Sequence, residues 1–275
     1  MPETALDPLK IRAHVADFDV FLEAYRVASE NTRQTQRSML DVSYGMTKDE
    51  CMDLFFPQCP GPHPLHMFVH GGYWRAFSRK DYSFVADSIL DAGAVAAIVD
   101  YAHLPVARMG TLVEQVRKAA HWLVTHAESL GGKPDCVSAS GHSAGAHLAS
   151  YLVARGPLDA VTRLVPVQSL LLVSGIYDLR CVAESFLQPE LQLTCDEISN
   201  WSPLNADFPT DNPPLLVVGE RETAPFHTQA RQMNPTRYVS ISDENHMSIV
   251  MALGTPGTRM AGLLRDCVRG CRANS

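Results

Sequence analysis

The sequence predicts an α/β fold in which a mostly parallel β-sheet is flanked by helices. From about residue 50 onward, short apolar runs alternate with longer segments of helical periodicity. Parallel strands joined by right-handed helical crossovers produce this alternation. Several of the apolar runs are continuous, such as Leu-Leu-Leu-Val at 170–173 and Leu-Leu-Val-Val at 215–218. Strands that are buried on both faces of a sheet have this composition.

The individual elements follow from local patterns. Strands are expected at residues 51–56, 64–70, 94–101, 135–140, 169–174, 214–218 and 237–241. Residues 111–130 carry an apolar stripe of helical period that stops at Gly131-Gly132, which predicts a helix. Other helices are expected at 81–91, 144–154 and 257–272, the last with basic residues near its end, where they complement the helix dipole.

The first 45 residues do not follow this alternation. Residues 18–33 form an amphipathic helical pattern that precedes the expected strands. We therefore expect residues 1–45 to form an N-terminal cap segment. The 275 residues contain no internal repeat, low-complexity tract or Gly/Ser linker, so a single domain over residues 1–275 is expected.

Composition and charge exclude several classes of protein. Hydrophobic residues make up 46% of the chain, and 23 basic against 30 acidic residues give a net charge of −7. A nucleic-acid or anionic-membrane partner would require a basic surface, and no apolar run approaches the twenty residues of a spanning helix. The acidic N-terminus lacks a signal-sequence pattern, and the seven cysteines include no C-x-x-C pair. We expect a cytoplasmic protein with no metal or cofactor.

The strongest chemical signal is the motif Gly141-His142-Ser143-Ala144-Gly145, a G-x-S-x-G sequence between an expected strand and an expected helix. A nucleophilic serine at a sharp strand-to-helix turn requires this context, because small neighbours let the backbone bend there. The motif predicts Ser143 as the nucleophile and the amide of Ala144 as a donor to the substrate oxygen.

A second motif, His70-Gly71-Gly72-Tyr73-Trp74, ends the strand expected at 64–70. A glycine-rich turn at this place can supply the backbone N–H groups of an oxyanion hole, because a Cβ would block their approach to the substrate. Gly71 and Gly72 are therefore the predicted donors. Tyr73, Trp74 and His142 are candidate substrate-binding residues, although the two aromatic side chains could equally serve as packing.

A nucleophilic serine also needs a base and an acid that orients it, in the chain order Ser, Asp or Glu, His. His246 follows the last expected strand and is the predicted base. Three carboxylates follow the strands expected at 169–174 and 214–218: Asp178, Glu220 and Glu222. The residues alone do not decide which of the three orients His246.

With these residues in place, the chain resembles α/β-hydrolases of the kynurenine formamidase (arylformamidase) type, within the hormone-sensitive-lipase-like esterases. The resemblance begins near Leu40 and covers most of the chain, with the turn at residues 70–74 as its most discriminating part. Its other matching stretches are 41–45 (Asp-Val-Ser-Tyr-Gly), 141–148 (Gly-His-Ser-Ala-Gly-Ala-His-Leu) and 174–179 (Ser-Gly-Ile-Tyr-Asp-Leu).

The resemblance implies both an acid and an activity. Glu222, spaced after Gly219 and before Phe226 and Gln229 as in the family, corresponds to the triad acid, where Asp is more common. The implied reaction is hydrolysis of an aryl formamide, N-formyl-L-kynurenine, in tryptophan breakdown, by an enzyme that could be a homodimer. Alternatives are a carboxylesterase for small esters, an amidase for other aromatic amides and, more remotely, a catalytically silent ligand-binding protein.

Overall fold

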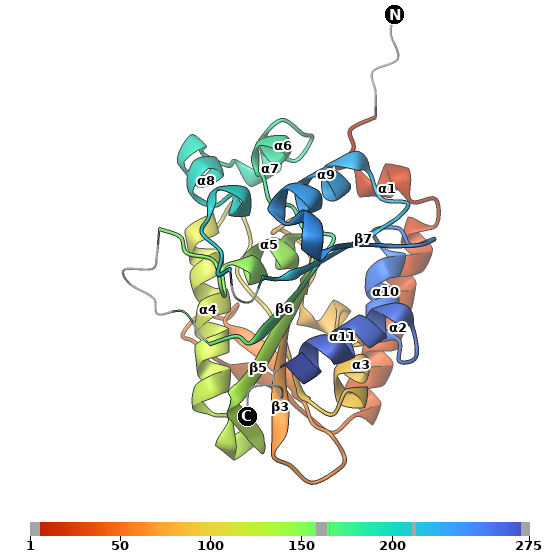
Figure 1. The fold of residues 1–275 in the computed structure, drawn as a ribbon, viewed down its shortest axis with the longest axis vertical. Coiled ribbons are helices and arrows are strands. Elements are labelled where there is room, and N and C mark those ends of the chain that lie inside the picture. The colour runs from red at the N-terminus through yellow and green to blue at the C-terminus, as the bar shows by residue number, and fades with distance from the viewer. Residues whose placement is uncertain (1–5, 158–163, 165, 211–212, 271–275) are drawn as a thin grey trace, which may run out of the picture.

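The computed structural model describes residues 6–157, 164, 166–210 and 213–270, and within them eight strands form one twisted sheet (Figure 1). The strand order is β1-β2-β4-β3-β5-β6-β7-β8. β1 and β2 are antiparallel to their neighbours, and the pairs from β4 to β8 are parallel. The strands are β1 Ser38–Ser43, β2 Cys51–Phe55, β3 His63–Val69, β4 Val95–Val99, β5 Gly132–His142, β6 Ser169–Val173, β7 Leu215–Gly219 and β8 Tyr238–Ile241.

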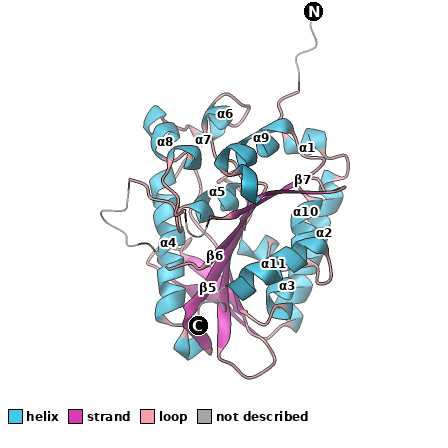
Figure 2. Ribbon diagram, viewed as in Figure 1, coloured by secondary structure: helices cyan, strands magenta, loops and turns pink. Residues whose placement is uncertain are grey.

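Helices cover both faces of this sheet (Figure 2). In Figure 1, α4 and α5 lie on one face, and α3, α10 and α11 lie on the other. The helices of the described residues are α1 Ile11–His14, α2 Phe18–Thr35, α3 Val85–Asp91, α4 Met109–Thr125, α5 Ala144–Ser150, α6 Arg180–Ala183, α7 Gln188–Leu191, α8 Cys195–Asn200, α9 Ala224–Met233, α10 Ser248–Gly254 and α11 Arg259–Gly270. None of the helices in these residues is long and apolar enough to span a bilayer.

The expected mostly parallel sheet is confirmed, and all seven expected strands are present with ends shifted by up to three residues. The continuous apolar runs are buried, as in β4, where every residue is inaccessible to solvent. The sequence did not reveal β1. This strand lies at the edge of the sheet, and its apolar residues Met39 and Leu40 are exposed, so it lacks the alternation that marks a half-buried strand.

Several expected helix boundaries were wrong. The helix expected at 81–91 begins only at Val85, because residues 79–81 form a separate 3₁₀ turn in which the Ser78 and Asp81 side chains form a capping box. The helix expected at 111–130 ends at Thr125, before a 3₁₀ turn at Glu128–Leu130. The helix expected at 144–154 ends at Ser150. Residues 271–272 of the last expected helix lie outside the described residues.

The chain before β1 packs first against the loop that follows β3 and then along the helices on one face of the sheet. Ile11, Val15 and Tyr25 are buried there, and α2 contacts α3 and α10. Tyr25 donates a hydrogen bond of 2.5 Å from its hydroxyl to the carbonyl oxygen of Met247, just before α10. The N-terminal helices therefore lie beside the region in which the sequence predicts the site.

Candidate active site

Ser143 occupies the turn between β5 and α5 in a strained backbone conformation. Its φ of 55° and ψ of −120° lie in a region that residues with a side chain rarely adopt. Both glycines of the motif are required by close contacts. A Cβ on Gly145 would overlap the carbonyl oxygen of Val69, and one on Gly141 would overlap the carbonyl of Gly145. The motif thus lets α5 pack directly against the end of β3.

The glycine turn after β3 lies beside Ser143. A Cβ on Gly71 would stand 3.2 Å from the Cβ of Ser143, and Gly72 has a φ of 118° that strongly favours glycine. His70 Nδ1 donates a 2.7 Å hydrogen bond to the Gly71 carbonyl oxygen, and the Tyr101 hydroxyl donates one to the His70 carbonyl. Because Gly71 C=O and Gly72 N–H belong to one peptide plane, the bond from His70 also fixes the direction of that N–H.

His246 and Glu222 form a buried hydrogen-bonded pair. His246 Nδ1 lies 2.6 Å from Glu222 Oε2, and the two side chains are 7% and 0% exposed. The other carboxylate oxygen, Oε1, accepts hydrogen bonds from the Gly219 amide at 2.7 Å and the Ser174 hydroxyl at 2.5 Å. Since a carboxylate only accepts, Nδ1 carries the hydrogen and Nε2 of a neutral His246 is left as a base.

The structure separates the three candidate acids by their partners. Glu220 is exposed and accepts a hydrogen bond from the Asp243 amide. Asp178 pairs with Arg180 at 2.6 Å, and this hydrogen bond holds the pKa of its carboxyl below the ordinary value. Of the three, only Glu222 contacts His246.

The loop around His246 is held by side chains from distant parts of the chain. His142 Nε2 donates to the His246 carbonyl oxygen at 3.0 Å, and Tyr25 donates to the carbonyl of the next residue, Met247. The ring of Phe226 packs against the His246 ring with centroids 4.6 Å apart. Sequence reasoning missed Tyr25, because a tyrosine within an amphipathic helix gives no sign of a partner more than two hundred residues away.

Two small cavities meet at Ser143. The first has a volume of about 30 Å³ and is lined by Ile11, Phe18, Gly72, Tyr73, Phe77, Tyr82, His142, Ser143, His246 and Met247. The second, of about 10 Å³, is lined by Leu9, Tyr73, Trp74, Ser143, Ala144, Ile176, Val182, Leu187 and Phe226. A cavity needs roughly 10–15 Å³ to hold one water molecule, so the site as it stands accommodates only a few atoms.

The three predicted substrate-binding residues all line these cavities. Tyr73 lines both, and its hydroxyl donates to the Leu9 carbonyl oxygen at 2.5 Å while accepting from the Ile11 amide at 3.3 Å. Trp74 is 1% exposed, lines the second cavity and donates from Nε1 to His147 Nδ1. His142 lines the first.

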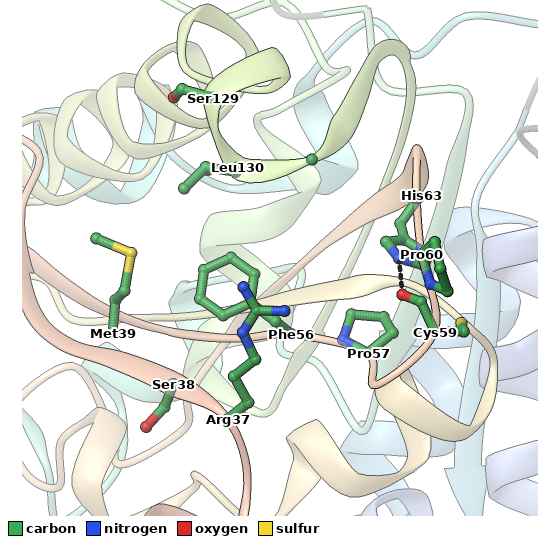
Figure 3. A pocket seen from close by; sticks show the side chains of 12 residues that line it. Arg37, Ser38, Met39, Phe56, Pro57, Cys59, Pro60, His63, Ser129 and Leu130 are labelled. Carbon is green, nitrogen blue, oxygen red and sulfur yellow. Dashed lines mark hydrogen bonds between the residues drawn. The ribbon is translucent and has the colours of Figure 1, made fainter.

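A larger pocket of about 300 Å³, which Figure 3 shows from close by, lies where β3 and β5 begin, at the end of these strands opposite Ser143. Its lining includes His63, where β3 begins, and Gly131, just before β5. The guanidinium of Arg37 lies over the Phe56 ring there, 5.6 Å from its centroid (Figure 3). This pocket contains none of the predicted site residues. Among the described residues, no three His, Cys, Asp or Glu side chains cluster in a way that could hold a metal ion.

A serine at a strained turn after β5, a glycine turn after β3 and a histidine after β8, all at one edge of a mostly parallel sheet, define the α/β-hydrolase fold. The solved structure of a candidate thioesterase from Silicibacter sp. TM1040 has the same fold, with a TM-score of 0.82, 23% identity and coverage of 93% of this chain and 97% of that one. The chain belongs to the BD-FAE family, which matches residues 52–250.

Curated relatives confirm the resemblance predicted from the motifs. Kynurenine formamidase of Danio rerio is 32% identical over 187 residues, and that of Salmo salar is 29% identical over 185 residues. Each match covers 67% of this chain and 59% of the relative. The chain thus spans about three fifths of the length of these relatives.

Proposed function

We propose that this protein is a serine hydrolase that cleaves aryl formamides, with N-formyl-L-kynurenine as the first substrate to test. The observation that carries the proposal is that His246, hydrogen-bonded to the buried carboxylate of Glu222, lines the same small cavity as Ser143. The names of the two fish relatives support the formamide as substrate.

The mechanism begins with attack of Ser143 Oγ on the formamide carbon, while His246 Nε2 takes the hydroxyl proton. The amides of Gly71 or Gly72 and of Ala144 hold the oxyanion, and loss of one such donor costs about 3 kcal/mol of transition-state stabilisation. His246 gives its proton to the departing arylamine nitrogen as the C–N bond breaks. Water then attacks the formyl-enzyme, transfers its proton through His246 and releases formate and free Ser143.

The aromatic part of the substrate has to enter a site that the N-terminal segment covers. Leu9 and Ile11 line the two cavities, and neither cavity has the volume of an aromatic ring. We therefore infer that residues 7–18 move aside to admit the substrate. Tyr73, which lines both cavities and contacts this segment, would then border the arylamine.

The test is the initial rate of N-formyl-L-kynurenine hydrolysis by the wild-type protein and by Ser143→Ala. We expect a wild-type kcat/KM of about 10⁴ M⁻¹s⁻¹ or more and a loss of at least about 10³-fold in the variant, since the nucleophile is gone. Circular dichroism of both proteins controls for folding. Full activity of Ser143→Ala would contradict the proposal. Cleavage of a small activated ester through Ser143, with no cleavage of the formamide, would instead assign a carboxylesterase.

A further inference from the structure

His142, which directly precedes Ser143, is a buried polar group that the mechanism above does not use. Its side chain is 1% exposed and forms part of the wall of the cavity shared by Ser143 and His246. Its ring lies 4.7 Å from the ring of His246 and 6.2 Å from that of Tyr82, measured between centroids. The side chain therefore lies next to the reacting groups, in otherwise largely apolar surroundings.

The hydrogen bonds of His142 determine which ring nitrogen carries the proton. Nε2 lies 3.0 Å from the carbonyl oxygen of His246, which can only accept, so Nε2 carries the hydrogen. Burial, reinforced by the neighbouring His246, lowers the pKa of His142 well below its ordinary value, so the ring is neutral at physiological pH. Nδ1 is consequently an unprotonated acceptor.

Nδ1 has no hydrogen-bond partner among the described residues. It lies on the side of the glycine turn, 3.0 Å from the position that a Cβ on Gly71 would occupy. A buried acceptor without a donor is unfavourable, and native proteins leave few of them. An unmet acceptor on a side chain that lines the cavity of Ser143 and His246 points to a donor on the substrate.

We propose that Nδ1 of His142 accepts the N–H of the scissile amide, and that this bond makes the site prefer amides bearing an N–H over esters. This inference rests on the proposed function and names a specificity-determining residue for it. When Ser143 attacks, the amide nitrogen becomes pyramidal, and its lone pair must face His246 Nε2 to receive the proton. The N–H of that nitrogen then points in another direction and needs an acceptor. Nδ1 of His142, whose ring lies next to the ring of His246, is that acceptor.

An ester has an oxygen in place of the N–H, and an N-methyl amide has a methyl group. Both leave Nδ1 unpaired in the transition state, and the methyl group also collides with it. Sites with a buried polar group discriminate strongly against substrates that leave that group unpaired. The site should therefore favour the N–H amide by about 10- to 100-fold beyond the intrinsic reactivities of the substrates.

The experiment measures kcat/KM for formanilide, N-methylformanilide and phenyl formate with the wild-type protein and two variants. In His142→Gln, the side-chain amide nitrogen can still donate to the His246 carbonyl, but nothing stands at the Nδ1 position. In His142→Asn, the side-chain oxygen can replace Nδ1 as an acceptor, but the bond to His246 is lost. Circular dichroism and the melting temperature check that both variants fold.

We expect the ratio of the formanilide rate to the phenyl formate rate to fall about 10- to 100-fold in His142→Gln. The rate for N-methylformanilide should change in His142→Gln as the rate for phenyl formate does. Neither of these substrates has an N–H that would lose its acceptor. In His142→Asn the ratio should stay closer to that of the wild type, even though all rates fall. Equal losses for the three substrates in His142→Gln would overturn the inference and leave His142 as a residue that positions His246.

The inference and the proposed function fail in different ways. If the wild-type protein cleaves phenyl formate through Ser143 but neither formanilide nor N-formyl-L-kynurenine, the formamidase function is wrong, and the amide preference is wrong with it. If it cleaves formanilide and the ratio does not change in His142→Gln, only the role of Nδ1 is overturned.

Discussion

At the scale of single residues, Glu222 shows how one hydrogen bond separates candidates that the sequence treats alike. Glutamine at this position would present an amide N–H₂ or a rotated carbonyl to His246 Nδ1 and would disturb the other acceptor bonds, from Gly219 and Ser174. We expect Glu222→Gln to lower kcat by about 10³- to 10⁴-fold, because the ring then favours the tautomer whose Nε2 cannot accept a proton. Steady-state kinetics with the formamide substrate measure this loss, and KM should change little.

The matched control is Glu220→Gln, two residues away on the exposed side of the same turn. Its activity should stay within about twofold of the wild type, as for other surface changes. Equal losses in the two variants would mean that the turn as a whole matters and that the carboxylate of Glu222 has no special role.

Gly145 offers a second test at this scale, because its contacts demand the absence of a side chain. A methyl group there would overlap the carbonyl oxygens of Val69 and His70. We expect Gly145→Ala to lower the free energy of unfolding by about 1–3 kcal/mol, as overpacking does elsewhere, measured by urea denaturation.

Gly262→Ala is the control for Gly145→Ala. Gly262 lies within α11, and the nearest atom to an added methyl group would be the guanidinium of Arg265 at 3.9 Å. Because alanine favours a helix over glycine by up to about 1 kcal/mol, this variant should be more stable than the wild type. The same sign of change in both variants would refute the packing argument.

At the scale of helices and strands, the sequence predicted those elements whose residue pattern lies within a short stretch of the chain. The buried parallel strands and both glycine motifs were found because each depends on residues close together in the chain. The edge strand β1 and the four- to six-residue helices α6, α7 and α8 were not, since they are too exposed or too short to show a period. The cavity walls supplied by Leu9 and Ile11 were not predicted either, because apolar residues carry no mark of which distant group they will cover.

Residues 7–18, the N-terminal segment that covers the site, lead to a prediction about the hydrogen bonds that hold this segment in place. The Tyr73 hydroxyl bonds to both Leu9 and Ile11, while Thr223 donates to the Pro8 carbonyl at 2.8 Å. Tyr73→Phe keeps the ring in the cavity wall and removes the first two bonds. We expect it to favour opening of residues 7–18 by about 1 kcal/mol, or about fivefold, seen as faster amide hydrogen exchange in that segment.

Tyr238→Phe is the control for this attachment. It removes a hydroxyl whose hydrogen-bond partners are His227 and Arg231 rather than residues of the N-terminal segment. Exchange of residues 7–18 should then match the wild type. Unchanged exchange in Tyr73→Phe would mean that apolar packing of Leu9 and Ile11 holds the segment without help from the hydroxyl.

At the scale of the whole molecule, buried neutral histidines should make the stability depend on pH. His66 lies in the sheet with both ring nitrogens 2.7 Å from the hydroxyls of Ser138 and Ser140, and burial lowers its pKa to about 3. Burial, partly offset by the bond to the Trp201 carbonyl, lowers the pKa of His147 to about 4. Both pKa values lie below the ordinary 6.5. As the pH falls, these histidines are therefore protonated in the unfolded chain before they are protonated in the folded protein, which favours unfolding.

Stability is therefore complete above about pH 6.5 and falls as the pH decreases toward the folded-state values, by up to about 1.4 kcal/mol per pH unit for each histidine. Carboxylates with lowered pKa values, such as Asp100 beside His70 and Arg79, change the stability only at a lower pH than the histidines do. Burial would raise the pKa of Asp100, but the nearby His70 ring and the hydrogen bonds from Arg79 outweigh it. The stability that Asp100 adds is lost only as the pH falls below about 4. Between about pH 7.5 and 5, the histidines dominate.

We expect the free energy of unfolding to drop by about 2 kcal/mol per histidine, or about 4 kcal/mol from these two, between about pH 7.5 and pH 5. Urea denaturation at the two pH values measures this difference. In His147→Gln the drop should be smaller by about 2 kcal/mol whatever the absolute stability of the variant, because one titrating group is gone. His126→Gln, at an exposed position, is the matched control. A pH-independent stability in the wild type would show that neither histidine stays neutral in the folded protein. A drop in His147→Gln equal to that of the wild type would show the same for His147 alone.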